Sequence, residues 1–177
     1  MNMNFKHKIN NSELWPGFTS SDHLNELNDI ADNAFNKDSI EGYLAALLIY
    51  HQLCEEMAKV LIEDSRFFIK ASIYPLEIEF SKSKRIMFGG VIEQLKETVS
   101  FDNKELFIQK CQNFNQVRNS LAHGLTKKTS IDSVKQELES IKEVFDEIFV
   151  LFDQAHDWFY LCFKDFKKDK FIDIHDE

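Results

Sequence analysis

The residues best suited to chemistry lie together in the stretch RNSLAH, residues 118 to 123, just before a glycine. Arg118 carries a permanent charge on a planar guanidinium, whose fork of donors matches the oxygens of a phosphate. His123 suits proton transfer, because an unperturbed imidazole titrates at about pH 6.5. Asn119 can orient that imidazole or donate a hydrogen bond to a phosphate. The three side chains favour acid–base chemistry at a phosphate ester.

An ordinary helix end explains the same residues without any chemistry. A histidine followed by lysines complements the negative end of a helix dipole. Gly124 suits the position just past the last helical turn. Both explanations stay open from these residues alone.

A helical projection separates the polar residues of this segment from its apolar ones. Each residue of a helix turns by about 100°, which places Asn119 about 100° and His123 about 140° from Arg118. The opposite side carries an apolar stripe: Phe114, Val117, Leu121 and Leu125. We expect the stripe to face the core and the three polar residues to face away from it, with Asn119 one turn before His123.

A second polar pair, His51 and Glu55, lies four residues apart on a long predicted helix. The pair can hold a metal or support the cleft, although such a pair is more often a satisfied hydrogen bond in a half-buried position. No third and fourth ligand with recognisable spacing accompanies it, so we expect neither a metal nor another cofactor. The three cysteines are widely spaced and odd in number, which favours reduced core thiols in a cytoplasmic protein: Cys54, Cys111 and Cys162.

The charge distribution permits an RNA partner despite a net charge of −9. Between Lys82 and Lys128 there are nine basic and four acidic residues, a local balance of +5. Ordinary solvated loop lysines also explain this imbalance. The basic residues most suited to flank an RNA groove are Lys82, Lys84, Arg85, Lys127 and Lys128.

A long central helix is predicted to begin at the sequence DSIE, residues 38 to 41, with Asp38 as its cap. Its apolar residues recur at spacings of three and four: Tyr43, Leu47, Tyr50, Cys54, Met57 and Leu61. Three more residues are expected to widen this buried face: Leu44, Leu48 and Ile62.

Further helices are predicted over residues 21–36 and 90–99, then from an Asp102 cap to about Gly124, and over residues 131–166. A short irregular or β-like crossover is expected at about residues 74–90. The inner stripe of the last helix is predicted to be Val134, Leu138, Ile141, Phe145, Ile148 and Phe152.

These elements predict an all-α, up-and-down bundle of about five helices. Residues 1–177 are expected to form a single domain, with the bundle over about residues 20–166 and both tails partly frayed. The apolar run YLAALLIY is far shorter than the roughly 20 residues that span a bilayer, and the N-terminus lacks the pattern of a secretory signal. We therefore expect no membrane partner and a cytoplasmic protein.

The motif and the order of helices resemble the HEPN superfamily. Members of that family carry an arginine, often followed by asparagine, and a histidine four to six residues after the arginine, on the fourth helix of a small bundle. The sequence RNSLAH matches this pattern at Arg118, Asn119 and His123. The resemblance covers about residues 20–165.

The resemblance implies a homodimer whose two motif helices meet across a cleft. In active members this cleft cleaves RNA without a metal, through attack by the 2′-hydroxyl, in a toxin–antitoxin or defence role. Arg118, Asn119 and His123 are then the catalytic residues of a ribonuclease. The alternative is a non-catalytic HEPN-like module that binds RNA or a protein partner, such as an antitoxin, or regulates expression. Some toxins of the family have a tyrosine two residues after the histidine; Leu125 stands there in this chain.

Overall fold

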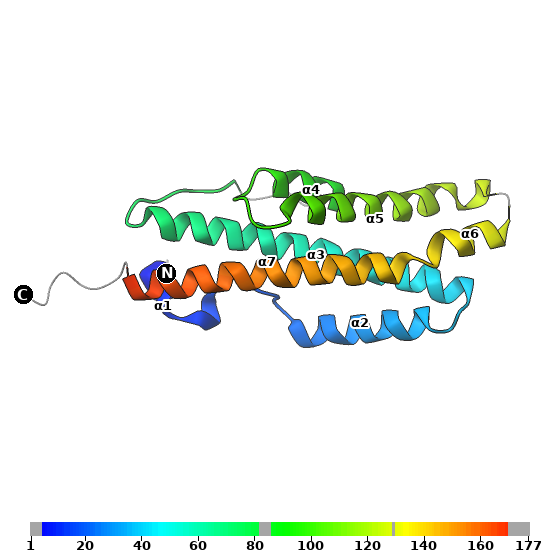
Figure 1. Cartoon of the computed structure of the whole chain (residues 1–177), viewed down its shortest axis with the longest axis horizontal. Helices are drawn as coiled ribbons and strands as arrows, with labels where there is room; N and C mark the ends of the chain where they lie inside the picture. Colours follow the sequence, from blue (N-terminus) through cyan, green and yellow to red (C-terminus); the bar gives the residue numbers. More distant parts are fainter. Residues whose placement is uncertain (1–4, 82–85, 129, 170–177) are drawn as a thin grey trace, which may run out of the picture.

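The chain folds into an elongated bundle of α-helices, which confirms the predicted all-α class (Figure 1). The computed structural model describes residues 5–81, 86–128 and 130–169, with side chains up to residue 166. Within these ranges it has no β-strand, and its helices are α1 (Phe5–Asn10), α2 (Ser21–Phe35), α3 (Ile40–Ile73), α4 (Phe88–Lys96), α5 (Lys104–Gly124), α6 (Ile131–Leu138) and α7 (Ile141–Asp169). Two short 3-10 turns, η1 (Ser12–Leu14) and η2 (Leu125–Lys127), accompany them.

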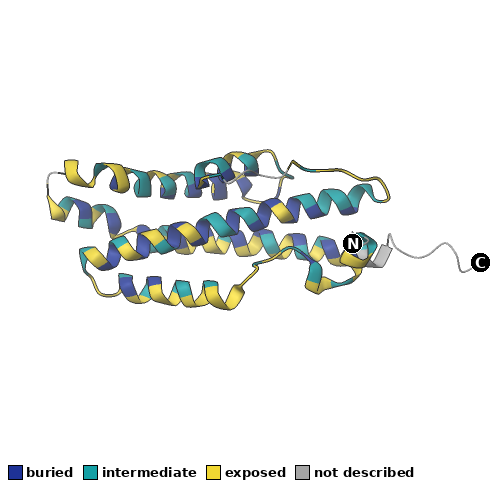
Figure 2. Cartoon of the chain, turned by 180° about the vertical axis from the view of Figure 1, so that it is seen from behind, coloured by how far each residue is buried: buried dark blue, intermediate teal, exposed yellow. Residues whose placement is uncertain are grey.

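Helix α3 forms the centre of the bundle, because it packs against α2, α4, α5, α6 and α7. Figure 2 shows buried residues along most of its length. The predicted stripe is buried throughout: Tyr43, Leu47, Tyr50, Cys54, Met57 and Leu61. Ile62 is also buried, and Leu44 is half-buried. The prediction for Leu48 was wrong: this side chain is 55% exposed, because it lies on the same uncovered face as Gln52, one turn later.

Ser39, rather than the predicted Asp38, caps the start of α3. The Oγ of Ser39 accepts a hydrogen bond from the backbone N–H of Gly42 at 3.1 Å. Ser39 has the extended backbone that an N-cap requires, whereas Asp38 has a φ of 50°. The Asp38 carboxylate instead accepts a hydrogen bond from the Tyr43 hydroxyl at 2.5 Å and pairs with Lys135 at 3.0 Å.

Gly42 allows α2 and α3 to approach closely, so we predict that Gly42→Ala destabilises the fold. A Cβ there would lie 2.2 Å from the carbonyl oxygen of Ala34, which forces the backbone to move. The strain outweighs the roughly 1 kcal/mol that alanine gains in helix propensity. The free energy of unfolding, measured in urea, should fall by about 1–3 kcal/mol. Gly17→Ala is the matched control, since nothing lies within 4 Å of a Cβ there; equal stabilities for the two variants would contradict the prediction.

The start of α5 differs from the predicted Asp102 cap. Asn103 occupies the N-cap position with a φ of 60° and makes no side-chain cap hydrogen bond. The next residue, Lys104, is buried and its Nζ donates to the carbonyl oxygens of Lys96 at 3.1 Å and Thr98 at 2.8 Å. The lysine thereby satisfies carbonyl groups at the end of α4, and its burial lowers its pKa.

The predicted single helix over residues 131–166 is two helices, α6 and α7, separated at residues 139–140. Ser130 caps α6 by accepting a hydrogen bond from the backbone N–H of Ser133 at 3.1 Å. The predicted inner stripe is buried on both sides of the break: Val134, Leu138, Ile141, Phe145, Ile148 and Phe152. Because the stripe keeps its period across the break, apolar spacing alone did not reveal it. The crossover is irregular over the residues described between α3 and α4.

A packed segment precedes the predicted bundle and covers one end of it. Ile9 in α1 is fully buried, and its carbonyl oxygen accepts a hydrogen bond from Nε1 of Trp15 at 3.0 Å. The Trp15 ring meets the rings of Tyr160 and Phe163 edge-on, at centroid distances of 4.7 and 5.6 Å. This aromatic contact fastens the segment to α7.

None of the helices in the described ranges has the length and apolar character needed to cross a bilayer.

Candidate active site on helix α5

The three motif residues lie in the last two turns of α5 and face away from the buried stripe, as the projection predicted. Arg118 and Asn119 are half-buried, whereas His123 is exposed. The stripe itself is buried at Phe114 and Leu121. Leu125, which the projection also placed in the stripe, is exposed because the helix has already passed into the turn η2.

Arg118 and Asn119 are joined directly. The Nη1 of Arg118 donates to Oδ1 of Asn119 at 3.0 Å, which holds the guanidinium along the helix surface. The Nε of Arg118 is buried and has no partner within the part of the chain that the structure describes. An enclosed donor without an acceptor carries a desolvation cost of about 1–3 kcal/mol.

His51 reaches the motif helix through Asn115, a residue that the sequence did not single out. The Nε2 of His51 donates to Oδ1 of Asn115 at 2.9 Å, and the imidazole meets the ring of Phe88 edge-on at 5.0 Å. Burial lowers the pKa of His51, and the nearby charge of Arg118 lowers it further, against an opposing effect of the Asn115 hydrogen bond. The imidazole is therefore neutral at physiological pH and fixes the helix turn that precedes Arg118 and Asn119.

Glu55 does not hydrogen-bond His51. Its carboxylate pairs with Lys59 at 2.7 Å, in the direction away from Asn115 along α3. The two predicted supporting residues therefore have separate partners, and only His51 is linked to the motif helix. In the described ranges, no three metal-binding side chains come together.

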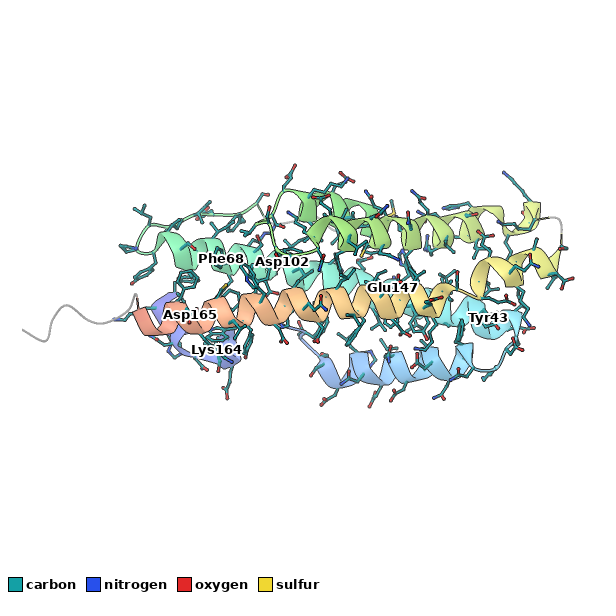
Figure 3. All side chains as sticks on the ribbon, in the orientation of Figure 1. Tyr43, Phe68, Asp102, Glu147, Lys164 and Asp165 are labelled. Atoms are coloured by element: carbon teal, nitrogen blue, oxygen red, sulfur yellow. The ribbon has the colours of Figure 1, made fainter. Side chains whose placement is uncertain are left out.

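Two of the five predicted RNA-binding residues are described, and they differ in environment. Lys127 is exposed beside the motif. Lys128 forms an ion pair with Glu137 of α6, so its charge is already matched within the chain. The other three, Lys82, Lys84 and Arg85, lie outside the described residues. At the same end of the bundle, α6 places Lys135 over the ring of Tyr43, labelled in Figure 3, with Nζ 5.9 Å from the ring centre.

The motif lies on the outer surface of the monomer rather than in a cavity. Arg118, Asn119 and His123 line none of the four pockets that stand out in the described chain. Exposed apolar residues lie close to it in sequence and structure. Leu125 follows the motif, and Met87, which is 87% exposed, precedes the Phe88 that contacts His51. A phosphate ester bound to one chain alone would therefore remain open to solvent.

Protein-family models, curated proteins and solved structures give no significant match to this chain.

The geometry assigns a different capacity to each polar residue. Arg118 and Asn119 form one polar unit that can bind an anion, and exposed His123 is accessible to a ligand beside them. The motif does not include Asn115 and Phe88, which both contact His51 in the structure. Asn115 lies one turn before Asn119 and was visible in the sequence as a polar residue on that face, but its partner His51 is 64 positions away.

Proposed function

We propose that the protein is a HEPN-like, metal-independent endoribonuclease with a toxin or defence role. The observation that carries this proposal is the pairing of Arg118 with Asn119 at 3.0 Å beside an exposed histidine on the same helix end. A charged planar fork can stabilise negative charge on a phosphate, and an accessible imidazole can transfer a proton, two of the roles that metal-free cleavage of RNA needs.

The proposed reaction breaks one phosphodiester bond and consumes no water in its first step. The 2′-hydroxyl oxygen attacks the adjacent phosphorus and loses its proton to a base, while the 5′-oxygen leaves and receives a proton from an acid. The products are a 2′,3′-cyclic phosphate and a free 5′-hydroxyl. His123 carries a proton in this scheme, and Arg118 stabilises the extra negative charge on the phosphorane.

We propose further that the active form is a two-fold homodimer with the two motifs facing each other. Each chain supplies a single exposed histidine in its motif, whereas the reaction gains from one base and one acid. A two-fold axis places the same patch of each subunit opposite itself and so brings two His123 side chains into one cleft. The open position of the motif, together with exposed Leu125 and Met87 near it, supports an interface at this surface.

A non-catalytic module that binds RNA or a protein partner is the second function we consider. The net charge of −9 and the ion pair between Lys128 and Glu137 favour the protein partner over RNA, because both weaken the attraction for RNA. An antitoxin that covers the same exposed surface is one partner of this kind.

Cleavage in the presence of EDTA distinguishes these functions. We expect the purified protein to cut single-stranded RNA with or without EDTA and to leave 2′,3′-cyclic phosphate ends, identified by mass spectrometry. Cleavage that stops on EDTA treatment would exclude the metal-free mechanism. If varied RNAs remain intact at physiological salt but bind, the non-catalytic function replaces the enzymatic one.

A further inference from the structure

A second site lies at the other end of the bundle from the motif. A cavity of about 590 Å³ opens between α3 and the segment formed by α1, η1 and the start of α2. Its volume falls within the range of about 300–1,000 Å³ that is typical of pockets for small molecules. Figure 1 places α1 beside the last turns of α7, whereas α5 ends beside α6 at the opposite end of the long axis.

Four aromatic residues contribute to the cavity wall. They are Phe5, Trp15, Phe18 and Phe67. The Phe5 and Phe67 rings are in contact, with centroids 5.3 Å apart. The Trp15 ring packs edge-on against the rings of Tyr160 and Phe163, and its Nε1 donates a hydrogen bond to the carbonyl oxygen of Ile9. The indole therefore has a fixed orientation, and the wall is preformed for a flat apolar group.

The charged residues of the wall leave two cations without a carboxylate partner. Glu56 pairs with Lys59 at 2.7 Å, and Glu63 pairs with Arg66 at 2.6 Å. The two remaining cations of the wall, Lys8 and Lys70, have no carboxylate partner within the described chain. Lys70 lies 5.6 Å from the centre of the Phe80 ring, a contact that leaves its charge unneutralised. The wall therefore carries a local surplus of positive charge in a protein of net charge −9.

We propose that this cavity binds a small aromatic molecule that carries a dianionic group, such as an aryl phosphate. The aromatic wall receives the ring, and the surplus charges of Lys8 and Lys70 attract the dianion. A neutral aromatic compound lacks the second interaction, and an inorganic phosphate lacks the first. The site is independent of the proposed ribonuclease activity, because none of the motif residues lines the cavity.

Fluorescence of Trp15 tests this proposal directly. The chain has two tryptophans, so Trp158→Phe leaves Trp15 as the only reporter, in the wall of the cavity itself. In this background we expect phenyl phosphate to change the Trp15 emission in a saturable way. Phenol and inorganic phosphate, tested separately, should bind at least about tenfold more weakly, because each lacks one of the two interactions.

Charge-reversal variants identify the residues that bind the dianion. Lys8→Glu and Lys70→Glu should each weaken phenyl phosphate binding by about tenfold or more, with unchanged helical circular dichroism. Lys37→Glu is the matched control, because this exposed lysine lies at the α2–α3 junction, far from the cavity wall; it should change binding less than twofold.

Either of two results in the fluorescence titrations would overturn the proposal. One is a lack of saturable response to phenyl phosphate, and the other is equal binding of phenol and phenyl phosphate. An equal loss in Lys37→Glu would show non-specific attraction and overturn it as well. Arg118→Ala should retain full binding of phenyl phosphate while losing RNA cleavage, so failure of one proposal is distinguishable from failure of the other.

Discussion

Arg118→Ala and His123→Ala should each reduce RNA cleavage at least about 100-fold and leave the bundle folded. Positioned proton transfer contributes roughly 10²- to 10⁴-fold to a rate, and His123→Ala removes it. Arg118→Ala removes the charge that stabilises the phosphorane and leaves Asn119 without its 3.0 Å partner. His123 is exposed and Arg118 half-buried, outside the apolar stripe of α5, so neither change opens a core cavity. Single-turnover cleavage and thermal unfolding measure the two effects separately.

Gln116→Ala is the matched control for these variants. Gln116 is exposed on the same helix and precedes the motif, so its replacement should change neither cleavage nor stability appreciably. In cells, expression of the wild type should be toxic and expression of His123→Ala should not. Toxicity that persists in His123→Ala would contradict a catalytic role for this residue.

Mixed dimers test whether the active site is shared between two chains. Arg118→Ala chains and His123→Ala chains are each expected to cleave RNA at least about 100-fold more slowly than the wild type. If the cleft is composite, a heterodimer contains one intact arginine and one intact histidine across it and should recover part of the activity. A protein that sediments as a monomer at micromolar concentration would exclude this arrangement.

Periodicity in the sequence predicted those parts of the fold that depend on one helix at a time. The buried stripe of α3 and the outward direction of Arg118, Asn119 and His123 both follow from a turn of about 100° per residue. The same rule failed at Leu48, because the spacing shows where an apolar face lies but not how wide a strip its neighbours cover.

The remaining features depend on contacts between distant segments. His51 hydrogen-bonds Asn115 across 64 positions, and no local pattern distinguishes this partner from Glu55 at the next helical turn. The break at residues 139–140 was hidden because Leu138 and Ile141 keep the helical spacing and are both buried. The cavity beside Trp15 forms only when α1 folds back on α3 and α7, so its residues showed no pattern of their own.

One long-range contact should have a large effect on the free energy of unfolding when one partner is removed. It is the buried ion pair between α3 and α7. The Nδ1 of His156 donates to Oδ2 of Asp64 at 2.7 Å, and Asp64 is fully buried. Its second oxygen, Oδ1, has no hydrogen-bond partner in the described ranges. Burial raises the pKa of Asp64 to about 6, against the lowering effect of His156. Burial also lowers the pKa of His156, but the hydrogen bond and charge of Asp64 outweigh it, so the net shift is upward.

His156→Ala should therefore lower the free energy of unfolding by about 3–5 kcal/mol at pH 8, where Asp64 becomes a buried carboxylate without its partner. Denaturation in urea at fixed pH measures this loss. His23→Ala is the matched control: this histidine is exposed on α2, and its removal should change stability by no more than about 0.5 kcal/mol. A loss in His156→Ala no larger than in His23→Ala would contradict the prediction.

The pH dependence of the loss follows from the direction of the pKa shifts. An acid whose pKa is raised in the folded state contributes full stability below its unfolded pKa of about 3.9 and loses it as the pH rises through the folded value. A histidine with a raised pKa likewise loses its contribution as the pH rises above about 6.5. In the wild type, this pair should therefore make the protein less stable as the pH increases from 4 to 8.

The His156→Ala variant should show a smaller loss at pH 5 than at pH 8. Without His156 the pKa of Asp64 rises further, because the hydrogen bond and charge that lowered it are gone, so the carboxyl is protonated at pH 5 and needs no partner charge. Adding Asp64→Asn removes the ionisable group altogether, so the double variant should recover part of the loss at pH 8 and none at pH 5. Equal stabilities of the single and double variants at pH 8 would contradict this prediction. The loss would then come from the lost packing of the imidazole against Phe152 and not from the buried carboxylate.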